Sequence, residues 1–269
     1  MTPLVLTSFT AVNALGRGNA AVLEALTAAR TGLRPCSFEQ VQLETWVGEV
    51  AGLDDLRVCE RLAEFDCRNN RLAELALEQD GFAARIAQVR EKYGARRIAV
   101  ILGTSTSGIL ETEHAYRRLD PATGALPAGF RYATTHNLYG LADFVRRYLD
   151  LAGPAATVST ACSSSAKVFA SASRLMALGL ADAVVVGGVD TLCRNTLYGF
   201  ASLDLVGREP CRPCDAERGG ISIGEAAGTI ASTGGSGIRP MRASASRTCC
   251  SFAATCASYE RSWKRHPPQ

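Results

Sequence analysis

The chain has 269 residues, of which 47% are hydrophobic and 20% are charged, the balance of an ordinary globular protein. No apolar run approaches the roughly 18–20 residues that a membrane-spanning helix needs, and residues 1–6 lack the basic segment that opens a signal peptide. We therefore expect a cytoplasmic protein without a membrane span. The net charge of +3 is concentrated in residues 231–269, which carry six basic residues against one acid, so no nucleic-acid partner is expected.

The N-terminal third predicts one strand followed by two helical regions, at residues 4–9, 19–29 and 69–93. In the first helical region Asn19 is a candidate N-cap, and Val22, Leu23 and Leu26 fall on one face. The second region has only a partial apolar stripe. Gly81 is a candidate break within it, because glycine is a poor helix former.

The middle of the chain predicts a buried strand and two further helices. Residues 97–103 form a near-continuous apolar run that ends in Gly103, a pattern typical of a buried parallel strand. A polar turn, a helix, a loop and an amphipathic helix follow, at residues 104–108, 109–118, 119–131 and 138–149.

A strand–helix–strand unit is predicted between residues 155 and 190. Its strands are residues 155–160 and 183–186, the second closed by Gly187-Gly188, and its helix is residues 162–178. Such a crossover joins parallel strands and is right-handed. The helix is rich in serine and alanine, so we expect it to lie deep in the molecule, where backbones approach closely.

Ten cysteines show no even, framework-like spacing, and a chain of this length does not need disulfides for stability. We interpret most of them as small buried hydrophobic residues. Cys211 and Cys214 form a single Cys-x-x-Cys pair, which is weak support for a metal site without a second pair. We expect neither a metal nor a cofactor.

Cys162 lies at the predicted junction between a strand and the N-terminus of a helix. Free backbone N–H groups and the positive end of the helix dipole favour a thiolate there, and the same N–H groups can stabilise an oxyanion. A thiolate attacks thioesters readily and leaves a reactive acyl-enzyme. From placement alone, a nucleophile and a buried structural cysteine are about equally favoured.

The residues around Cys162 resemble the nucleophile motif of the β-ketoacyl-acyl carrier protein synthases. The motif is Val158-Ser159-Thr160-Ala161-Cys162-Ser163-Ser164-Ser165. Four further stretches resemble family motifs in the family's order: Gly187-Gly188-Val189-Asp190, Tyr198-Gly199-Phe200-Ala201-Ser202-Leu203, Arg212-Pro213-Cys214-Asp215 and Gly224-Glu225-Ala226-Ala227-Gly228. The resemblance covers about residues 2–228, and residues 65–71 are similar to a bacterial subgroup associated with polyene-type acyl chains.

The resemblance implies an α/β, thiolase-like fold, of which residues 1–230 would form the N-terminal half, with a mainly parallel sheet and a buried nucleophile helix. It implies that Cys162 takes an acyl group from acyl carrier protein and that malonyl-carrier protein then loses carbon dioxide and attacks the acyl-enzyme. Phe200 would gate the acyl pocket, and Thr106 and Ser107 would line it. The family is usually dimeric, so a homodimer or heterodimer is expected, acting in fatty acid or polyene and polyketide biosynthesis.

The chain departs from the family in its C-terminal part. Family members run to about 400 residues, and their second half supplies two histidines, a lysine and a second oxyanion N–H group. None of the three histidines of this chain, His114, His136 and His266, lies in the family's sequence contexts. Residues 231–269 form a basic tail without a core pattern, which we interpret as disordered or derived from a frameshift. A C-terminal half is therefore missing, and we expect incomplete activity and poor solubility without a partner.

Three functions remain open at this point: a condensing acyltransferase, a non-catalytic partner subunit that binds acyl carrier protein, and a non-functional frameshifted fragment. Partner subunits of this family usually lack the nucleophile, so Cys162 argues against the second. Arg61, Arg68 and Arg71 could dock an acidic carrier protein, although a solvated helix face is the simpler interpretation.

Overall fold

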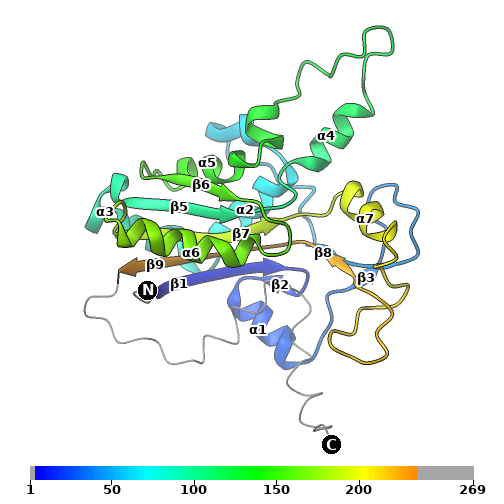
Figure 1. The fold of residues 1–269 in the computed structure, drawn as a ribbon, viewed down its shortest axis with the longest axis horizontal. Coiled ribbons are helices and arrows are strands. Elements are labelled where there is room, and N and C mark those ends of the chain that lie inside the picture. Colours follow the sequence, from blue (N-terminus) through cyan, green and yellow to red (C-terminus); the bar gives the residue numbers. More distant parts are fainter. Residues whose placement is uncertain (1–3, 235–269) are drawn as a thin grey trace, which may run out of the picture.

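The computed structural model describes residues 4–234, which form one six-stranded sheet with helices on both faces and a small second sheet (Figure 1). The strand order of the large sheet is β2-β1-β9-β7-β5-β6. Its strands are β1 (Leu4–Asn13), β2 (Gly16–Arg17), β5 (Ile98–Gly103), β6 (Ala155–Val158), β7 (Ala183–Asp190) and β9 (Ala226–Gly234). The helices that cover it are α1 (Asn19–Thr27), α2 (Arg68–Leu77), α3 (Phe82–Tyr93), α5 (Tyr139–Tyr148) and α6 (Ser164–Ala177).

The sheet is mixed. Strand β5 pairs in parallel with both β6 and β7, as the strand–helix–strand pattern predicts. Strand β9 runs antiparallel to both of its neighbours, β7 and β1, and β1 is also antiparallel to β2. The parallel prediction is therefore confirmed for the three strands around α6 and does not extend to the other half of the sheet.

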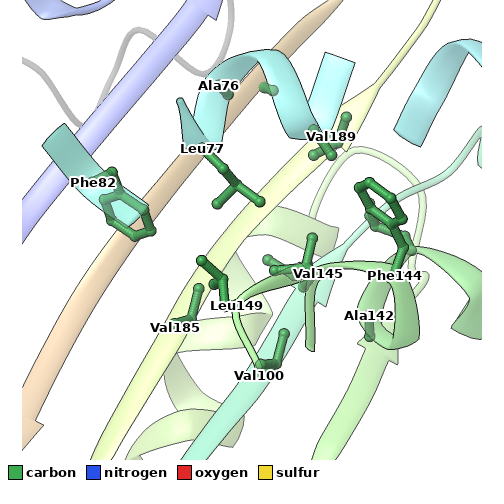
Figure 2. Packing of buried hydrophobic residues seen from close by; sticks show 14 of the residues in the cluster. Ala76, Leu77, Phe82, Val100, Ala142, Phe144, Val145, Leu149, Val185 and Val189 are labelled. Carbon is green, nitrogen blue, oxygen red and sulfur yellow. The ribbon is translucent and has the colours of Figure 1, made fainter. Parts of the chain in front are cut away.

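Alternate residues of β5 enter two separate cores, which explains why its whole sequence is apolar. Val100 and Leu102 pack with α2, α3 and α5 on one face of the sheet, where Phe82 and Phe144 are also fully buried (Figure 2). Ala99 and Ile101 pack against α6 on the opposite face. At about 25 cal/mol per Å² of apolar surface removed from water, these two layers dominate the stability of the fold.

The second sheet and two short helices lie beyond one end of the large sheet (Figure 1). The sheet has the order β3-β4-β8. Its strands are β3 (Arg34–Pro35), β4 (Trp46–Gly48) and β8 (Ile223–Gly224), and the helices are α4 (Ile109–Tyr116) and α7 (Arg194–Ala201). A third apolar cluster joins α4 and α7 to the loop before β4, through Leu110, Leu197 and Phe38.

The remaining described elements are short 3₁₀ and π-helical segments, and they include one expected break. They are the 3₁₀ segments η1 (Glu60–Phe65), η2 (Gln79–Gly81) and η3 (Ala95–Arg97), and the π-helical η4 (Tyr132–His136). Gly81 separates α2 from α3 with φ of +66°, which confirms the predicted break. None of the helices within residues 4–234 is long and apolar enough to cross a membrane.

Several local predictions were wrong. Gly187 and Gly188 lie inside β7 and do not end it. Leu23 is exposed, and Asn19 does not cap α1 with its side chain, because Gly18 is the N-cap and the Asn19 amide group donates to Phe9. The backbone N–H of Asn19 is instead accepted by the carboxylate of Asp80, a partner 61 residues away.

The expected burial of the cysteines also needs correction, whereas the expected domain boundary stays a prediction. Of the seven cysteines within the described residues, Cys67 and Cys193 are buried, whereas Cys162 and Cys214 are exposed. Strand β9 continues to Gly234, past the boundary expected at residue 230, because it fills the gap between β1 and β7. The rest of the expected tail lies outside the described residues.

Candidate active site

Three parallel strands end at one edge of the large sheet, and each is followed by a segment that the sequence analysis singled out. Strand β5 leads into residues 104–108, β6 into residues 159–163, and β7 into residues 190–193. Because β5, β6 and β7 are parallel and adjacent, their carboxyl ends meet at the same edge. Ligand sites of α/β sheets form at such edges.

Cys162 is exposed in a tight turn that leads from β6 into α6. Ala161, the preceding residue, has φ of +53°, a left-handed conformation that is unfavourable for a residue with a β-carbon. Serine side chains hold the turn: the Thr160 N–H donates to Ser164 Oγ over 2.9 Å, and Ser164 Oγ donates to the Ala161 carbonyl over 2.6 Å. The turn presents Cys162 two residues before α6 begins, and the N–H groups of Ser163, Ser164 and Ala166 already donate to backbone carbonyls of residues 160–163.

Two glycines allow α6 to approach the sheet. A β-carbon at Gly103 would stand 2.9 Å from the backbone of Ser164 and Ser165, and one at Gly188 would stand 2.2 Å from Ser165 Oγ. Neither distance is compatible with a side chain, so both positions require glycine. The small residues of α6 thus serve the close approach that was predicted. The helix buries one face, which includes Val168 and Ala172, while the opposite face is exposed.

The turn after β5 is fixed by Asp190, the last residue of β7. Its carboxylate accepts hydrogen bonds from the Ser105 and Thr106 N–H groups and from the hydroxyls of Thr104, Ser105 and Thr106, over 2.7–3.1 Å. The Ser107 hydroxyl donates to the Thr135 carbonyl over 3.1 Å. Thr106 and Ser107 are both buried, and their hydroxyls are occupied by protein groups. Their contact with substrate stays a prediction, and it would have to involve atoms other than these hydroxyls.

Phe200 lies in the last turn of α7, the helix that follows residues 190–193, and its side chain is half-buried. The structure therefore places Phe200 on an element that starts at the same edge as Cys162. Within residues 4–234 no hydrogen bond joins Cys162 to α7 or to the 104–108 turn. The gating role of Phe200 stays a prediction.

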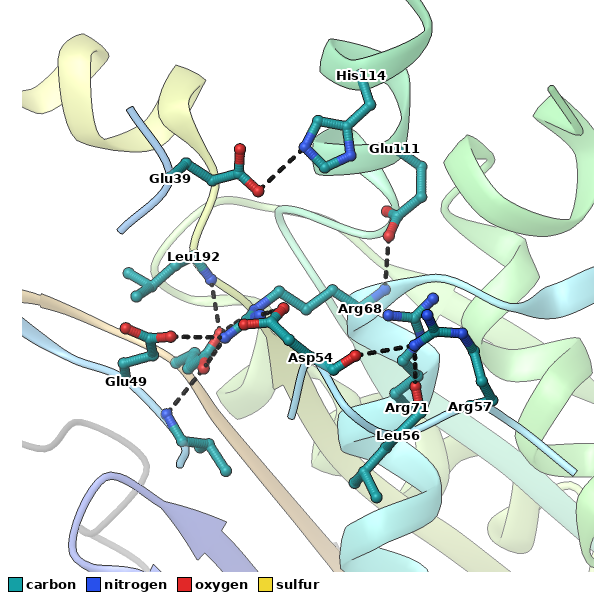
Figure 3. Close-up of polar contacts among 12 residues, drawn as sticks. Glu39, Glu49, Asp54, Leu56, Arg57, Arg68, Arg71, Glu111, His114 and Leu192 are labelled. Carbon is teal, nitrogen blue, oxygen red and sulfur yellow. Dashed lines mark hydrogen bonds and ion pairs between the residues drawn. The ribbon is translucent and has the colours of Figure 1, made fainter. Parts of the chain in front are cut away.

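A buried ion pair that sequence reasoning missed lies close to this edge of the sheet (Figure 3). Arg68 is 1% exposed, and its guanidinium donates to the two carboxylate oxygens of Glu225 over 2.9 and 2.8 Å. It also pairs with Asp54 and, over 3.4 Å, with Glu49. Burial by itself would lower the pKa of Arg68, but the hydrogen bonds and charge of Glu225 raise it, so the guanidinium stays charged.

The interpretation of Arg61, Arg68 and Arg71 as a solvated helix face was wrong for Arg68, and its buried guanidinium is not free to dock a carrier protein. Arg71 is paired bidentately with Asp66 over 2.7 and 2.6 Å. Arg61 is half-exposed and donates to two backbone carbonyls at the end of α5. The one sequence signal for the buried pair was Glu225, an acid between glycine and small residues that enters a buried strand.

Both histidines of the described part have partners away from Cys162. His114 contacts Glu39 over 3.1 Å. His136 contacts the Thr112 hydroxyl through Nδ1 over 2.6 Å and stacks on Tyr132. Neither of these contacts involves the edge that carries Cys162, as the sequence analysis expected, and His266 lies outside the described residues.

No cluster of three or more metal-binding side chains occurs among residues 4–234. Cys214 occupies the left-handed position of a turn from Arg212 to Asp215, with φ of +61°. Its neighbour Cys211 is half-buried, and both thiols are free.

Residues 2–231 match the protein family "Beta-ketoacyl synthase, N-terminal domain". The chain belongs to this family. Among curated proteins, it is 42% identical over 88 residues to 3-oxoacyl-[acyl-carrier-protein] synthase 2 of Rhizobium meliloti, which covers 30% of this chain and 21% of that protein. It is 28% identical over 230 residues to Nodulation protein E of Rhizobium meliloti, covering 84% of this chain and 56% of that protein.

Solved ketosynthases share the fold. The ketosynthase ApeO of Xenorhabdus doucetiae, solved in complex with its chain length factor ApeC, is 31% identical with a TM-score of 0.74 and covers 87% of this chain and 59% of its own. A β-ketoacyl synthase from Burkholderia phymatum, 22% identical, superposes with a TM-score of 0.71 over 95% of this chain and 62% of its own. These similarities confirm the thiolase-like α/β fold. The chain spans no more than about 60% of the relatives that it matches over most of its length.

Proposed function

We propose that Cys162 of this β-ketoacyl synthase chain accepts an acyl group from an acyl carrier protein, as the first half of a decarboxylative condensation. The observation that carries the proposal is the exposure of Cys162 in a strained turn at the N-terminus of α6, in contrast to the buried Cys67 and Cys193. A structural cysteine would be expected in the core, so this exposure favours a nucleophile.

In the proposed transfer, the Cys162 thiolate attacks the thioester carbonyl of the acyl-carrier protein. The bond from Cys162 sulfur to the carbonyl carbon forms first and gives a tetrahedral oxyanion; its collapse then breaks the carbon–sulfur bond to the carrier, and the released carrier thiolate takes up a proton. A backbone N–H group of this turn other than those of Ser163, Ser164 and Ala166, which donate within the turn, would stabilise the oxyanion of the intermediate. No cofactor takes part, because the substrate arrives already activated on its carrier.

In the second half, malonyl-carrier protein would lose carbon dioxide, and the resulting carbanion would attack the acyl group and release Cys162. Decarboxylation is the step that the family assigns to histidines. His114 and His136 have other partners, so we propose that residues 4–234 support acylation and do not by themselves support condensation. The product class would be a 3-oxoacyl thioester of fatty acid or polyene and polyketide biosynthesis.

We further propose that the functional protein pairs with a second condensing-enzyme subunit, either a second copy or a subunit similar to a chain length factor. Strand β6 is an edge of the large sheet and has β5 as its one partner among the described strands. An open edge of this kind can pair with another chain. ApeO was solved with its chain length factor, which supports a heterodimer as one form of this pairing. The cytoplasmic location stays a prediction.

The acylation can be tested by incubating the purified full-length chain with acyl-carrier protein, or with the inhibitor cerulenin, and measuring its intact mass. We expect one adduct, lost in Cys162→Ala and kept in Cys214→Ala, the matched variant at another exposed cysteine. No adduct would favour the frameshifted fragment, and carrier binding without an adduct would favour the non-catalytic partner subunit. A condensed 3-oxo product would show that the missing histidines are not needed.

A further inference from the structure

Helix α4 lies between the N-termini of two other helices and directs one carboxylate to each of them. Glu111 Oε1 accepts the Arg68 N–H at the start of α2 over 2.8 Å (Figure 3). Glu113 accepts the Arg194 and Asn195 N–H groups at the start of α7, over 3.1 and 2.7 Å. Residues two apart on a helix point in different directions, so one short helix can reach both partners.

The two capped helices lack caps of their own. The N-cap residues are Cys67 for α2 and Cys193 for α7, and neither makes a side-chain capping bond. The first N–H groups of a helix have no partners inside the helix, and leaving them unpaired in a buried place is costly. At the start of α2, Cys67 and Arg68 are each 1% exposed, so water has little access to a missing cap there, whereas Asn195 at the start of α7 is exposed. The carboxylates of α4 therefore supply caps that the local sequences do not.

Several backbone N–H groups of residues 191–195, the connection from β7 and the first two residues of α7, donate to side chains from elsewhere in the chain. The Thr191 N–H donates to Thr106 Oγ1 and the Leu192 N–H to Glu225 Oε2, each over 3.1 Å. Glu113 then takes the next two helical N–H groups. The start of α7 is thus held by polar contacts, in addition to the apolar packing of Leu197.

An open cavity of about 540 Å³ lies between α4 and α7, on the side where Glu113 contacts the start of α7. It is lined by Glu113, Arg117, Arg194, Asn195, Tyr198 and Gly199. Elsewhere the two helices are packed together through the apolar cluster that contains Leu110 and Leu197. The Glu113 carboxylate lines the cavity and caps the N-terminus of α7 beside it.

We infer that Glu113 is a positioning residue that holds α7, and through it Phe200, in place for acyl-chain selection. Glu111 has the equivalent role for α2, which carries Arg68. The inference about acyl selection rests on the proposed function, because it assumes that Phe200 lines the acyl pocket. The capping of two helices by one helix does not depend on that function.

The two N-cap cysteines report on the two caps independently. We expect Glu113→Ala to speed the modification of Cys193 by N-ethylmaleimide at least tenfold, while Cys67 changes less than twofold. Glu111→Ala should have the reverse effect. Peptide mass spectrometry of the full-length chain over time measures both rates. Equal acceleration of both cysteines in each variant, or no acceleration of Cys193 in Glu113→Ala, would overturn the inference. Glu113→Gln keeps one hydrogen-bond acceptor, so its rate of Cys193 modification should lie between those of the wild type and Glu113→Ala. This variant replaces Glu113→Ala in the test if the alanine variant does not fold.

The acyl-selection step is tested by the ratio of Cys162 acylation rates with a long-chain and a short-chain acyl-carrier protein. We expect Glu113→Gln to change this ratio at least fivefold, whereas general destabilisation would lower both rates together. Glu39→Gln is the matched control, because Glu39 pairs with His114 of α4 and with Arg117 just after it, and no hydrogen bond or ion pair joins it to α7 within residues 4–234. An unchanged ratio would overturn the role in selection. Absence of acylation in the wild type would refute the proposed function, and the cysteine rates would still decide the capping.

Discussion

Gly188 and Gly103 show how single atoms decide the approach of the nucleophile helix to the sheet. At Gly188 the obstacle to a β-carbon is a side-chain atom, Ser165 Oγ, whereas at Gly103 it is the backbone of α6. The first obstacle can be removed by mutation and the second cannot. A side chain at Gly188 would therefore clash mainly with a side chain of α6, whereas one at Gly103 would clash with the helix backbone.

We expect Gly188→Ala to lower the free energy of unfolding by about 1–3 kcal/mol, the usual cost of overpacking a core. Adding Ser165→Ala should restore part of this loss, and the same addition should not restore Gly103→Ala. Urea denaturation monitored by circular dichroism measures each value. Gly199→Ala is the control, since no atom lies within 4 Å of its β-carbon position. Equal rescue of both glycine variants would contradict the assigned contacts.

Glu111 predicts a pH-dependent stability. Burial raises its pKa above the ordinary value of 4.5, and the hydrogen bond from the Arg68 N–H compensates only in part; its Oε2 is buried and has no hydrogen-bond partner among residues 4–234. A carboxyl with a raised folded-state pKa contributes stability that is present below about pH 4.5 and is lost as the pH rises through the folded value. The ionised form therefore destabilises the protein at neutral pH.

We expect Glu111→Gln to gain stability relative to the wild type as the pH is raised from 4.5 to 7.5, because glutamine does not ionise. Urea denaturation of both proteins across this range measures the difference. Glu91→Gln, at an exposed position of α3, should show no such trend. A difference that stays constant with pH would show that Glu111 ionises normally in the folded protein.

At the scale of elements, the Arg68–Glu225 pair joins α2 to the start of β9 and to two loops. Glu225 Oε1 also accepts the Val50 N–H, and its Oε2 accepts the Leu192 N–H. Removing one partner of a buried ion pair leaves an uncompensated charge, which typically costs about 3–5 kcal/mol. Through these contacts the pair joins α2 to the segments that contain Val50 and Leu192, close to the candidate site.

We expect Arg68→Met to lower the free energy of unfolding by about 3–5 kcal/mol, measured by chemical denaturation. Arg30→Ala, which breaks an exposed pair with Glu24, should cost less than about 1 kcal/mol. The double variant Arg68→Met with Glu225→Gln should lose less than the two single losses added together. Additive losses would show that the two side chains act separately.

Local patterns predicted the elements around Cys162 well, and contacts distant in sequence explain what they missed. The strand–helix–strand unit was predictable because its periodicity and glycines lie within 36 residues. The insertion of β9 between β1 and β7 was not, because its partners are separated from it by long stretches of chain. The capping of α1 by Asp80 and of α7 by Glu113 was hidden for the same reason.

For the whole molecule, the exposed face of α6 is the main departure from the expected buried helix. Leu178 and Leu180, just beyond its end, are 73% and 49% exposed. Exposed apolar groups on one side of a sheet favour association. The sequence motif predicted that Cys162 lies between a strand and a helix, as it does, and its role as nucleophile stays a prediction. The motif could not show which surfaces of this chain remain uncovered.

We expect the purified chain to self-associate, and we expect Leu178→Lys with Leu180→Lys to reduce the association constant severalfold, measured by sedimentation velocity. Leu203→Lys, at a residue that is 65% exposed in the loop after α7, is the control and should have little effect. A wild-type chain that stays monomeric at high concentration and melts sharply would contradict this expectation.

The pairing of β1 with β9 has a consequence for synthesis of the chain. Leu4 pairs with Gly234 and Asn13 with Ala226. The first described strand, β1, therefore cannot pair with β9 until the ribosome has made the last described strand. At about 5–20 residues per second, a ribosome needs roughly 10–45 seconds to make the residues between them. During that time β1 presents an open edge to the cell. Chaperone binding to nascent chains should therefore fall only after β9 has left the ribosome.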